Sequence, residues 1–243
     1  MLLKDEGVLT PYQSASADDI PQRYIDPEGY WTGFGGRARI LLVNTDLVPE
    51  DEYPESIFDL PNHSRVCIAY PMFGTSATHA AALYATLGPD ETRDFYSNLQ
   101  SSGARVVDGN SVVRDLVASG QLDMGLTDTD DACGAIRKGA PVKIIFLDQT
   151  ENSLGTLIIP NSISLIKGSP NPDEAKILID HLLSRQVEES LVASGWIQVS
   201  LRPVDIEPFC PLVPDIKDMN VSFHDIYLQN QQAKEDLREI FIQ

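Results

Sequence analysis

The chain has few cysteines and few histidines, and these shortages count against several classes of protein. Its three cysteines, Cys67, Cys133 and Cys210, lie far apart with no Cys-x-x-Cys pair, which argues against a disulfide framework and a structural zinc site. Its four histidines form neither an HxxxH nor an HExxH pattern, so a zinc protease is not indicated. No Gly-x-Ser-x-Gly elbow is present either, and we expect no catalysed reaction.

Positive charge is also scarce. The sequence contains 36 Asp and Glu against 18 Lys and Arg, a formal net charge of -18. Nucleic acid and anionic membrane surfaces repel a chain of this charge, so neither is an expected partner. We interpret the acidity first as a solubility feature and second as a sign of cation handling.

Long hydrophobic runs are missing as well. No apolar stretch approaches the ~20 residues that a membrane-spanning helix needs. The first residues, Met1 to Glu6, include three charged side chains and have neither the apolar core nor the cleavage site of a signal peptide. Taken alone, the start of this sequence predicts a cytoplasmic protein.

Short apolar runs instead alternate with amphipathic segments. Strands are predicted at 39–44, 65–70, 104–107, 122–126 and 142–146, and helices at 75–87, 90–102, 111–118 and 130–137. This alternation is typical of an α/β domain with a largely parallel sheet. A second zone begins near residue 149, and its predicted strands are 156–159 and 162–166, its helices 172–184, 186–193 and 222–241, and its proline-rich connector 203–214. The first 36 residues, rich in Gly and Pro, are predicted to form an ordered loop.

Two strand-to-helix turns carry groups suited to an anion. The first contains Gly74, Thr75 and Ser76, and the second contains Asn110 and Ser111. Free N–H groups at a helix start favour negative charge, and ligands of open α/β sheets bind where the carboxyl ends of strands meet helix starts. The simpler interpretation is that one polar side chain in each turn caps its own helix.

A third turn is rich in carboxylates. Asp128, Asp130 and Asp131 follow the predicted strand 122–126 and could hold a hard cation through oxygen ligands. Alternatively, Asp128 or Thr129 caps the next helix, while Asp130 and Asp131 lie in its first turn, where the helix dipole favours acidic groups. The spacing alone does not decide between a metal site and a helix start.

The order of these segments resembles the type 2 periplasmic binding proteins of ABC importers, and among them the ferric-iron-binding proteins. The stretches that carry the resemblance are Trp31–Gly33 with Gly36–Arg39, Tyr70–Ser76, Gly109–Val113, Gly120–Asp128 and Asn171–Ser184. The resemblance implies an α/β fold of two lobes joined by crossover strands, with the first lobe incomplete. Residues 1–37 and 151–205 would form the remnant of lobe 1, and residues 38–150 and 206–243 would form lobe 2.

The resemblance also implies a ligand site. In such relatives a synergistic anion lies beside the metal, and the matching anion-binding positions here are Arg37, the Gly74–Ser76 turn and Asn110. The sequence departs from the family pattern in two respects. First, the opening segment of the family's first lobe, with its signal peptide and some metal ligands, has no counterpart here. Second, Asp130 and Asp131 stand where ferric-binding members carry adjacent tyrosines, which sets a different metal selectivity.

We therefore expect a monomeric solute-binding protein that captures Fe(III), or a related metal–anion complex, as cargo and delivers it to the membrane subunits of an ABC permease. The family expectation for its location is the periplasm. One alternative is a binding protein of the same fold for an organic or oxyanionic solute. Another is a cytosolic effector-binding module, since one fold hosts many functions.

Overall fold

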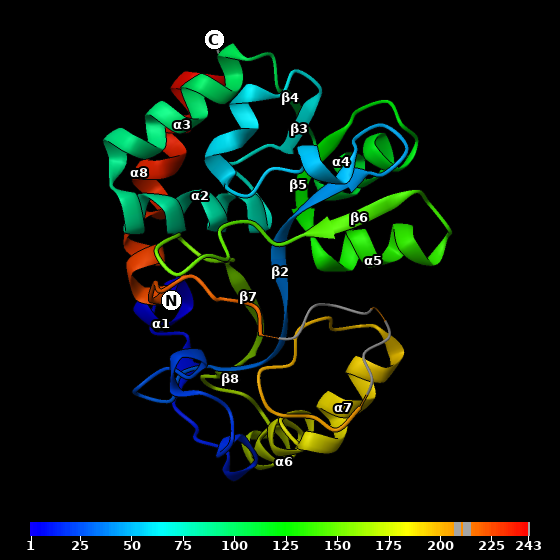
Figure 1. Cartoon of the computed structure of the whole chain (residues 1–243). Helices are drawn as coiled ribbons and strands as arrows, with labels where there is room; N and C mark the ends of the chain where they lie inside the picture. The colour runs from blue at the N-terminus through cyan, green and yellow to red at the C-terminus, as the bar shows by residue number, and fades with distance from the viewer. Residues whose placement is uncertain (207–209, 211–214, 243) are drawn as a thin grey trace. The chain divides into compact units, whose positions relative to one another are not determined.

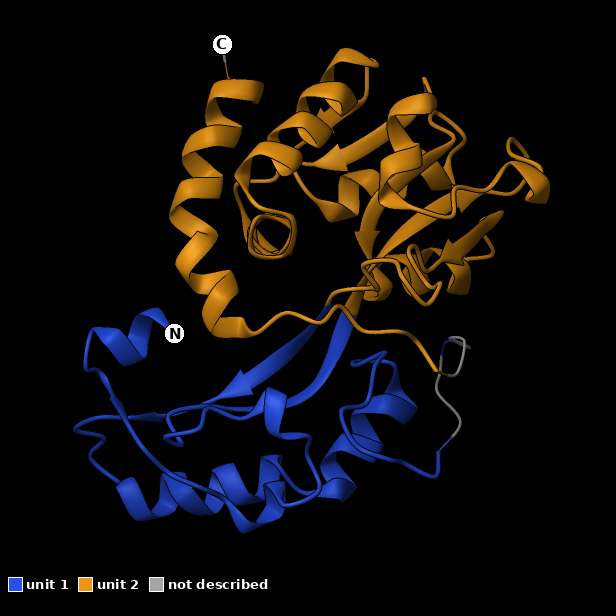
Figure 2. Cartoon of the chain, turned by 60° about the vertical axis from the view of Figure 1, so that its left-hand side comes forward, with its two compact units in different colours: residues 1–37, 158–213 blue, residues 38–157, 214–243 orange. Residues whose placement is uncertain are grey.

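The chain folds into two compact units. The computed structural model describes residues 1–206, 210 and 215–242. Unit 1 comprises residues 1–37 and 158–213, and unit 2 comprises residues 38–157 and 214–243 (Figure 2). The two units divide after residues 157 and 213, whereas the expected lobe boundaries were 150 and 205. Residues 207–209 and 211–214 of the predicted connector lie outside the described residues.

A mixed sheet forms the centre of unit 2. Its strands run in the order β4 (Arg105–Val107), β3 (Val66–Ala69), β5 (Met124–Asp128), β2 (Thr32–Asn44) and β6 (Val142–Ile145) (Figure 1). The prediction that 104–107, 122–126 and 142–146 share one sheet is confirmed. The sheet is not largely parallel, however, because β2 pairs antiparallel with both β5 and β6. The strands β3, β4 and β5 are parallel to one another, so their carboxyl ends share one edge.

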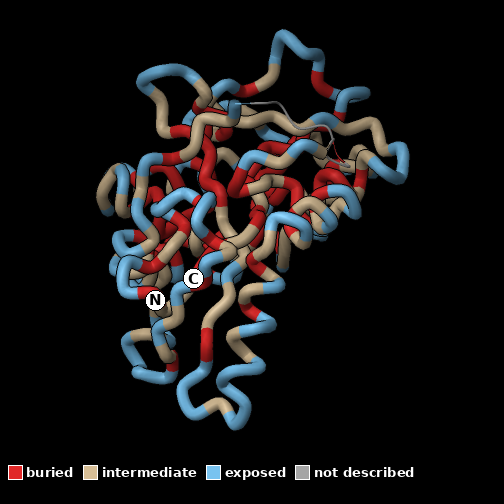
Figure 3. Tube along the Cα trace, turned by 90° about the horizontal axis from the view of Figure 1, so that it is seen from below, coloured by how far each residue is buried: buried red, intermediate tan, exposed pale blue. Residues whose placement is uncertain are grey.

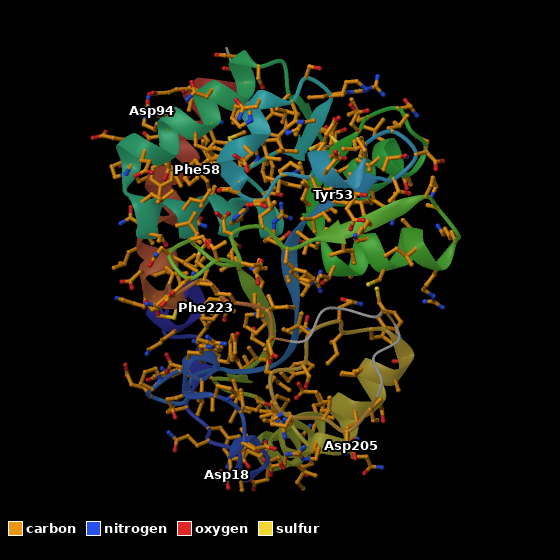
Figure 4. The ribbon with its side chains drawn as sticks, in the orientation of Figure 1. Asp18, Tyr53, Phe58, Asp94, Asp205 and Phe223 are labelled. Carbon is orange, nitrogen blue, oxygen red and sulfur yellow. The ribbon has the colours of Figure 1, made fainter. Side chains whose placement is uncertain are left out.

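The helices of unit 2 follow the strands as the sequence predicted. They are α2 (Gly74–Leu87), α3 (Pro89–Ser101), α4 (Asn110–Ala118), α5 (Thr129–Arg137) and α8 (Phe223–Phe241). Helix α8 packs against α2, and the buried Tyr84 hydroxyl donates a hydrogen bond to Asp236 Oδ2 at 3.0 Å. Phe58, labelled in Figure 4, packs edge-to-face on Phe95 of α3 with ring centroids 5.7 Å apart. Two short 3-10 helices, Glu50–Glu52 and Ile57–Asn62, lie between β2 and β3.

The core of unit 2 lies on both faces of the sheet. Residues Ile40 to Val43 of β2 are at most 1% exposed, so this strand is an uninterrupted apolar run, and Figure 3 shows such buried stretches in red. Gly125 on β5 lets α4 approach closely: a Cβ at this position would lie 2.5 Å from Val113 Cγ1 and 2.7 Å from Cys67 Sγ. A larger residue at position 125 would push these neighbours apart.

Unit 1 combines the N-terminal segment with residues from the second half of the chain. Its strand β1 (Leu9–Thr10) pairs with β8 (Leu165–Ile166), and β7 (Ile158–Ile163) pairs with β2. Its helices are α1 (Leu2–Asp5), α6 (Pro172–Leu182) and α7 (Arg185–Ser194), with 3-10 turns at Ala15–Ala17 and Gln22–Tyr24. A buried ion pair supports it, since Glu188 Oε2 lies 2.9 Å from Arg202 Nε and the side chains are 1% and 2% exposed.

Three local predictions were wrong. The strand β2 begins at Thr32 rather than at residue 39, because the glycines of Thr32–Arg37 obscure its strand pattern. The strand β7 continues through Pro160, where a break was predicted, and a strand with one pairing partner among the described residues tolerates proline. Finally, Cys67 is buried and free, but Cys133 and Cys210 are disulfide-bonded, which the sequence did not predict. No helix in the described part of the chain is long and apolar enough to cross a membrane.

Candidate functional site

A buried ion pair joins β2 to β5 at the carboxyl end of β5. The antiparallel register places Arg39 directly opposite Asp128. Arg39 Nη1 lies 2.6 Å from Asp128 Oδ1, and the two side chains are 3% and 2% exposed. Charged side chains are rarely buried this deeply unless they are paired, so this pair is a marked feature of the edge where the parallel strands end.

Polar groups from two helix starts converge on the same carboxylate. Thr75 Oγ1 donates to Asp128 Oδ2 at 2.6 Å, and Asn110 Nδ2 donates to the same oxygen at 2.8 Å. Asn110 Oδ1 accepts from Arg39 Nη1 at 3.1 Å and from Ser76 Oγ at 3.4 Å. We call these five residues the Arg39 cluster: Arg39, Thr75, Ser76, Asn110 and Asp128.

The capping predictions for these turns were wrong. Helix α2 has Phe73 at its N-cap position, α4 has Gly109 and α5 has Asp128, and none of the three makes a side-chain cap hydrogen bond. By contrast, Ser184 and Ser222 do cap α7 and α8. Thr75 and Asn110 therefore lie inside the first turns of their helices, where their side chains bind Asp128 instead of closing the helix end.

A neutral histidine lies next to the cluster. His79 of α2 is 7% exposed. Burial, together with the nearby positive charge of Arg39, lowers its pKa to about 3. His79 therefore stays uncharged at ordinary pH, and the net charge of the cluster is set by Arg39 and Asp128 alone.

The predicted anion-binding residues divide between the two units. Thr75, Ser76 and Asn110 come together as expected. Ser111 and Gly74 are exposed, and a φ of 55° at Gly74 allows the turn that opens α2. Arg37 belongs to unit 1, where its Nη2 lies 3.5 Å from Asn161 Oδ1, so the structure does not bring it into this set.

The guanidinium group of the cluster belongs to Arg39, which sequence reasoning missed. In the sequence, Arg39 is the first residue of the apolar strand predicted at 39–44. A charge at the end of a fully buried strand was the available signal, because such a charge needs a buried partner.

The three predicted metal-binding carboxylates are not assembled into one group. Both oxygens of Asp128 accept hydrogen bonds within the Arg39 cluster. Asp131 Oδ1 accepts instead from Arg114 Nη1 at 3.1 Å, and Asp130 beside it is partly buried in the first turn of α5. Among the described residues, no group of three or more His, Cys, Asp or Glu side chains is arranged to hold a metal ion.

Comparisons with known proteins match both the sequence and the fold. The model of a family described as bacterial extracellular solute-binding protein matches residues 1–208. Iron uptake protein A1 of Synechocystis sp. is 26% identical over 207 residues, which are 79% of this chain and 56% of that protein. A probable ABC transporter periplasmic-binding protein of Sinorhizobium fredii is 26% identical over 192 residues, 74% of this chain and 51% of the relative. The chain thus spans a little over half the length of these curated relatives.

Solved structures agree on the fold. The ferric binding protein from Campylobacter jejuni superposes with a TM-score of 0.86 at 21% identity, covering 98% of this chain and 79% of that one. The type 2 periplasmic-binding-protein fold that the sequence predicted is therefore confirmed.

Proposed function

Because the chain belongs to the family of bacterial extracellular solute-binding proteins, we propose that it is the substrate-binding component of an ABC importer. Its cargo is ferric iron or a related metal complex, which it captures in the periplasm and delivers to the permease subunits in the membrane. It carries out no reaction of its own. Its relatives' names support this assignment, since they include an iron uptake protein and an ABC transporter periplasmic-binding protein.

The observation that carries this proposal is the Arg39 cluster. Hydrogen bonds between its side chains fix the starts of α2 and α4 beside the end of β5, at the sheet edge where open α/β proteins bind ligands. The same edge carries the acidic first turn of α5. An acidic turn held by a rigid polar cluster is suited to a hard cation.

Asp130 and Asp131 are the proposed cargo contacts of this edge. Carboxylate oxygens are hard donors that suit a trivalent cation. Asp131 is half-buried and paired with Arg114, so binding a metal through Asp131 would exchange one positive partner for another. Asp128 is not assigned this role, because its two oxygens are committed to the Arg39 cluster.

The test is a metal titration with a charge-matched control. Purified protein is titrated with ferric citrate and with Ga³⁺ by equilibrium dialysis, alongside the double variant Asp130→Asn/Asp131→Asn. The control is Asp90→Asn/Glu91→Gln, which removes the same charge from the first turn of α3. We expect the control to bind like the wild type and the α5 variant to lose at least tenfold in affinity. Absence of metal binding in the wild type would contradict the proposal.

A second candidate function is capture of an organic or oxyanionic solute. It is favoured by the lack, among the described residues, of a group of three or more possible metal ligands. The first-turn N–H groups of α2 and α4, which have no side-chain cap, suit an anion. Titration of the wild type with phosphate, sugar phosphates and dicarboxylates, with metal excluded by a chelator, separates this function from the first.

A further inference from the structure

We propose that the Asp128 carboxylate is a built-in anion, which fills the anion-binding position of the Arg39 cluster. The wild-type cluster then takes no external anion, and it becomes a binding site for a small carboxylate when the Asp128 side chain is removed. This inference deepens the proposed function and rests on it in one respect: the metal cargo would bind without a synergistic anion at this position.

The donors around Asp128 are those that an external carboxylate would need. One oxygen accepts from the Arg39 guanidinium at 2.6 Å, and the other accepts from the Thr75 hydroxyl at 2.6 Å and the Asn110 amide at 2.8 Å. A guanidinium, a hydroxyl and an amide that converge on two oxygens form a complete carboxylate site. The side chain that occupies this site comes from the chain itself.

The electrostatics of the cluster leave no place for a second anion there. The positive charge of Arg39 is balanced by Asp128, and the adjacent His79 is uncharged because burial lowers its pKa to about 3. An external anion would therefore meet no net positive charge. It would also approach the carboxylates of Asp130 and Asp131, which follow Asp128 in the first turn of α5.

The hydrogen-bond partners of Asp128 also distinguish the Arg39–Asp128 pair from an ordinary cross-strand ion pair. Such a pair needs only the register that places Arg39 opposite Asp128. Here two further donors, from the starts of α2 and α4, bind the oxygen that Arg39 does not contact. Neither helix gains a side-chain cap from this arrangement, so the Thr75 and Asn110 side chains serve to bind the carboxylate.

The experiment is chemical rescue. Asp128→Ala removes the carboxylate and leaves the three donors facing a space of about its size. Thermal unfolding is followed while formate replaces chloride at constant ionic strength. We expect the melting temperature of the variant to rise saturably, by about 5–10 °C at formate about 100 times its dissociation constant. The wild type should not respond.

The matched control is Asp123→Ala, which breaks the exposed pair with Arg65 near the start of β5. It should not respond to formate, because the site it opens faces solvent. If Asp128→Ala does not fold in chloride, recovery of folded protein by preparation in formate supports the proposal. Asp128→Ser is a less disruptive substitution, and we expect it to respond to formate in the same way. Folded Asp128→Ala and Asp128→Ser proteins that ignore formate, acetate and bicarbonate would overturn it, as would an equal response in the control.

A second measurement separates this inference from the proposed function. Ga³⁺ affinity of the wild type is measured with and without bicarbonate, and we expect the two values to agree within about twofold. If the wild type binds no metal while Asp128→Ala is rescued by formate, the proposed function fails and the built-in anion stands. If metal binding requires bicarbonate and no rescue occurs, the built-in anion fails and the proposed function stands.

Discussion

Removing one partner of the buried pair Arg39–Asp128 should destabilise unit 2 far more than removing one partner of the exposed pair Arg65–Asp123. The two pairs have nearly the same nitrogen–oxygen distance, 2.6 Å and 2.7 Å. They differ in burial, since the side chains of the first pair are 3% and 2% exposed and those of the second 49% and 27%. The comparison therefore contrasts a buried ion pair with an exposed one of similar length.

The expected magnitudes follow from this burial. Arg39→Ala leaves the Asp128 carboxylate buried with only the neutral donors of Thr75 and Asn110. Removing one partner of a buried pair costs about 3–5 kcal/mol of unfolding free energy. Removing one partner of an exposed pair costs about 0.2–1 kcal/mol. Arg65→Ala is therefore the matched control for Arg39→Ala.

The assay is urea unfolding, with hydrogen exchange of peptides from β2 and β5 as the local readout. The double variant Arg39→Ala/Asp128→Ala closes a thermodynamic cycle with the single variants Arg39→Ala and Asp128→Ala. It should lose less than the sum of their losses, by about 0.5–3 kcal/mol, because no charge is left buried alone. If Arg39→Ala and Arg65→Ala destabilise the protein equally, the reasoning from burial is refuted.

Three further predictions concern other buried groups. Because burial holds the pKa of His79 near 3, against 6.5 in the unfolded chain, only the unfolded state gains a proton as the pH falls below 6.5. The free energy of unfolding should thus fall by up to about 1.4 kcal/mol per pH unit between pH 6.5 and about 3. In acid unfolding curves, His79→Gln should flatten this slope, whereas the control His181→Gln, at an exposed position, should leave it unchanged. Gly125→Ala should cost about 1–3 kcal/mol in urea unfolding, since its Cβ would lie 2.5 Å from a side-chain atom of α4. Gly134→Ala should be neutral or stabilising, because no atom beyond its chain neighbours and its own helix backbone lies within 4 Å of the added Cβ. Glu188→Ala should cost unit 1 about 3–5 kcal/mol, measured by tryptophan fluorescence because both tryptophans lie in that unit; a loss below 1 kcal/mol would contradict it.

The sequence predicted the elements of unit 2 well because their signals are local. A helix such as α3 begins at Pro89 and is followed by Ser102 and Gly103, and the strand of β5 is bounded by turn residues. Such patterns depend on neighbours within a few positions. The direction of β2 in the sheet is not encoded in such local patterns. Whether that strand runs parallel or antiparallel is decided by its pairing with distant segments.

The candidate site was predicted in part for the same reason. The turns that contain Thr75 and Asn110 were identified from their position after strands, and they do meet in the structure. The family resemblance indicates Arg37 rather than Arg39 as the arginine of the site. Which of two arginines two positions apart reaches Asp128 depends on the register between β2 and β5, and no local pattern encodes that register.

The cap predictions failed because a local bond competed with a distant charge. A side-chain cap stabilises a helix by about 1 kcal/mol, whereas a hydrogen bond to a charged group contributes about 1.5–3 kcal/mol. Asp128 is almost fully buried, so each donor that it loses leaves carboxylate surface without water. Thr75 and Asn110 therefore gain more by binding Asp128 than by closing their own helices. The consequence is that the starts of α2 and α4 have no side-chain cap.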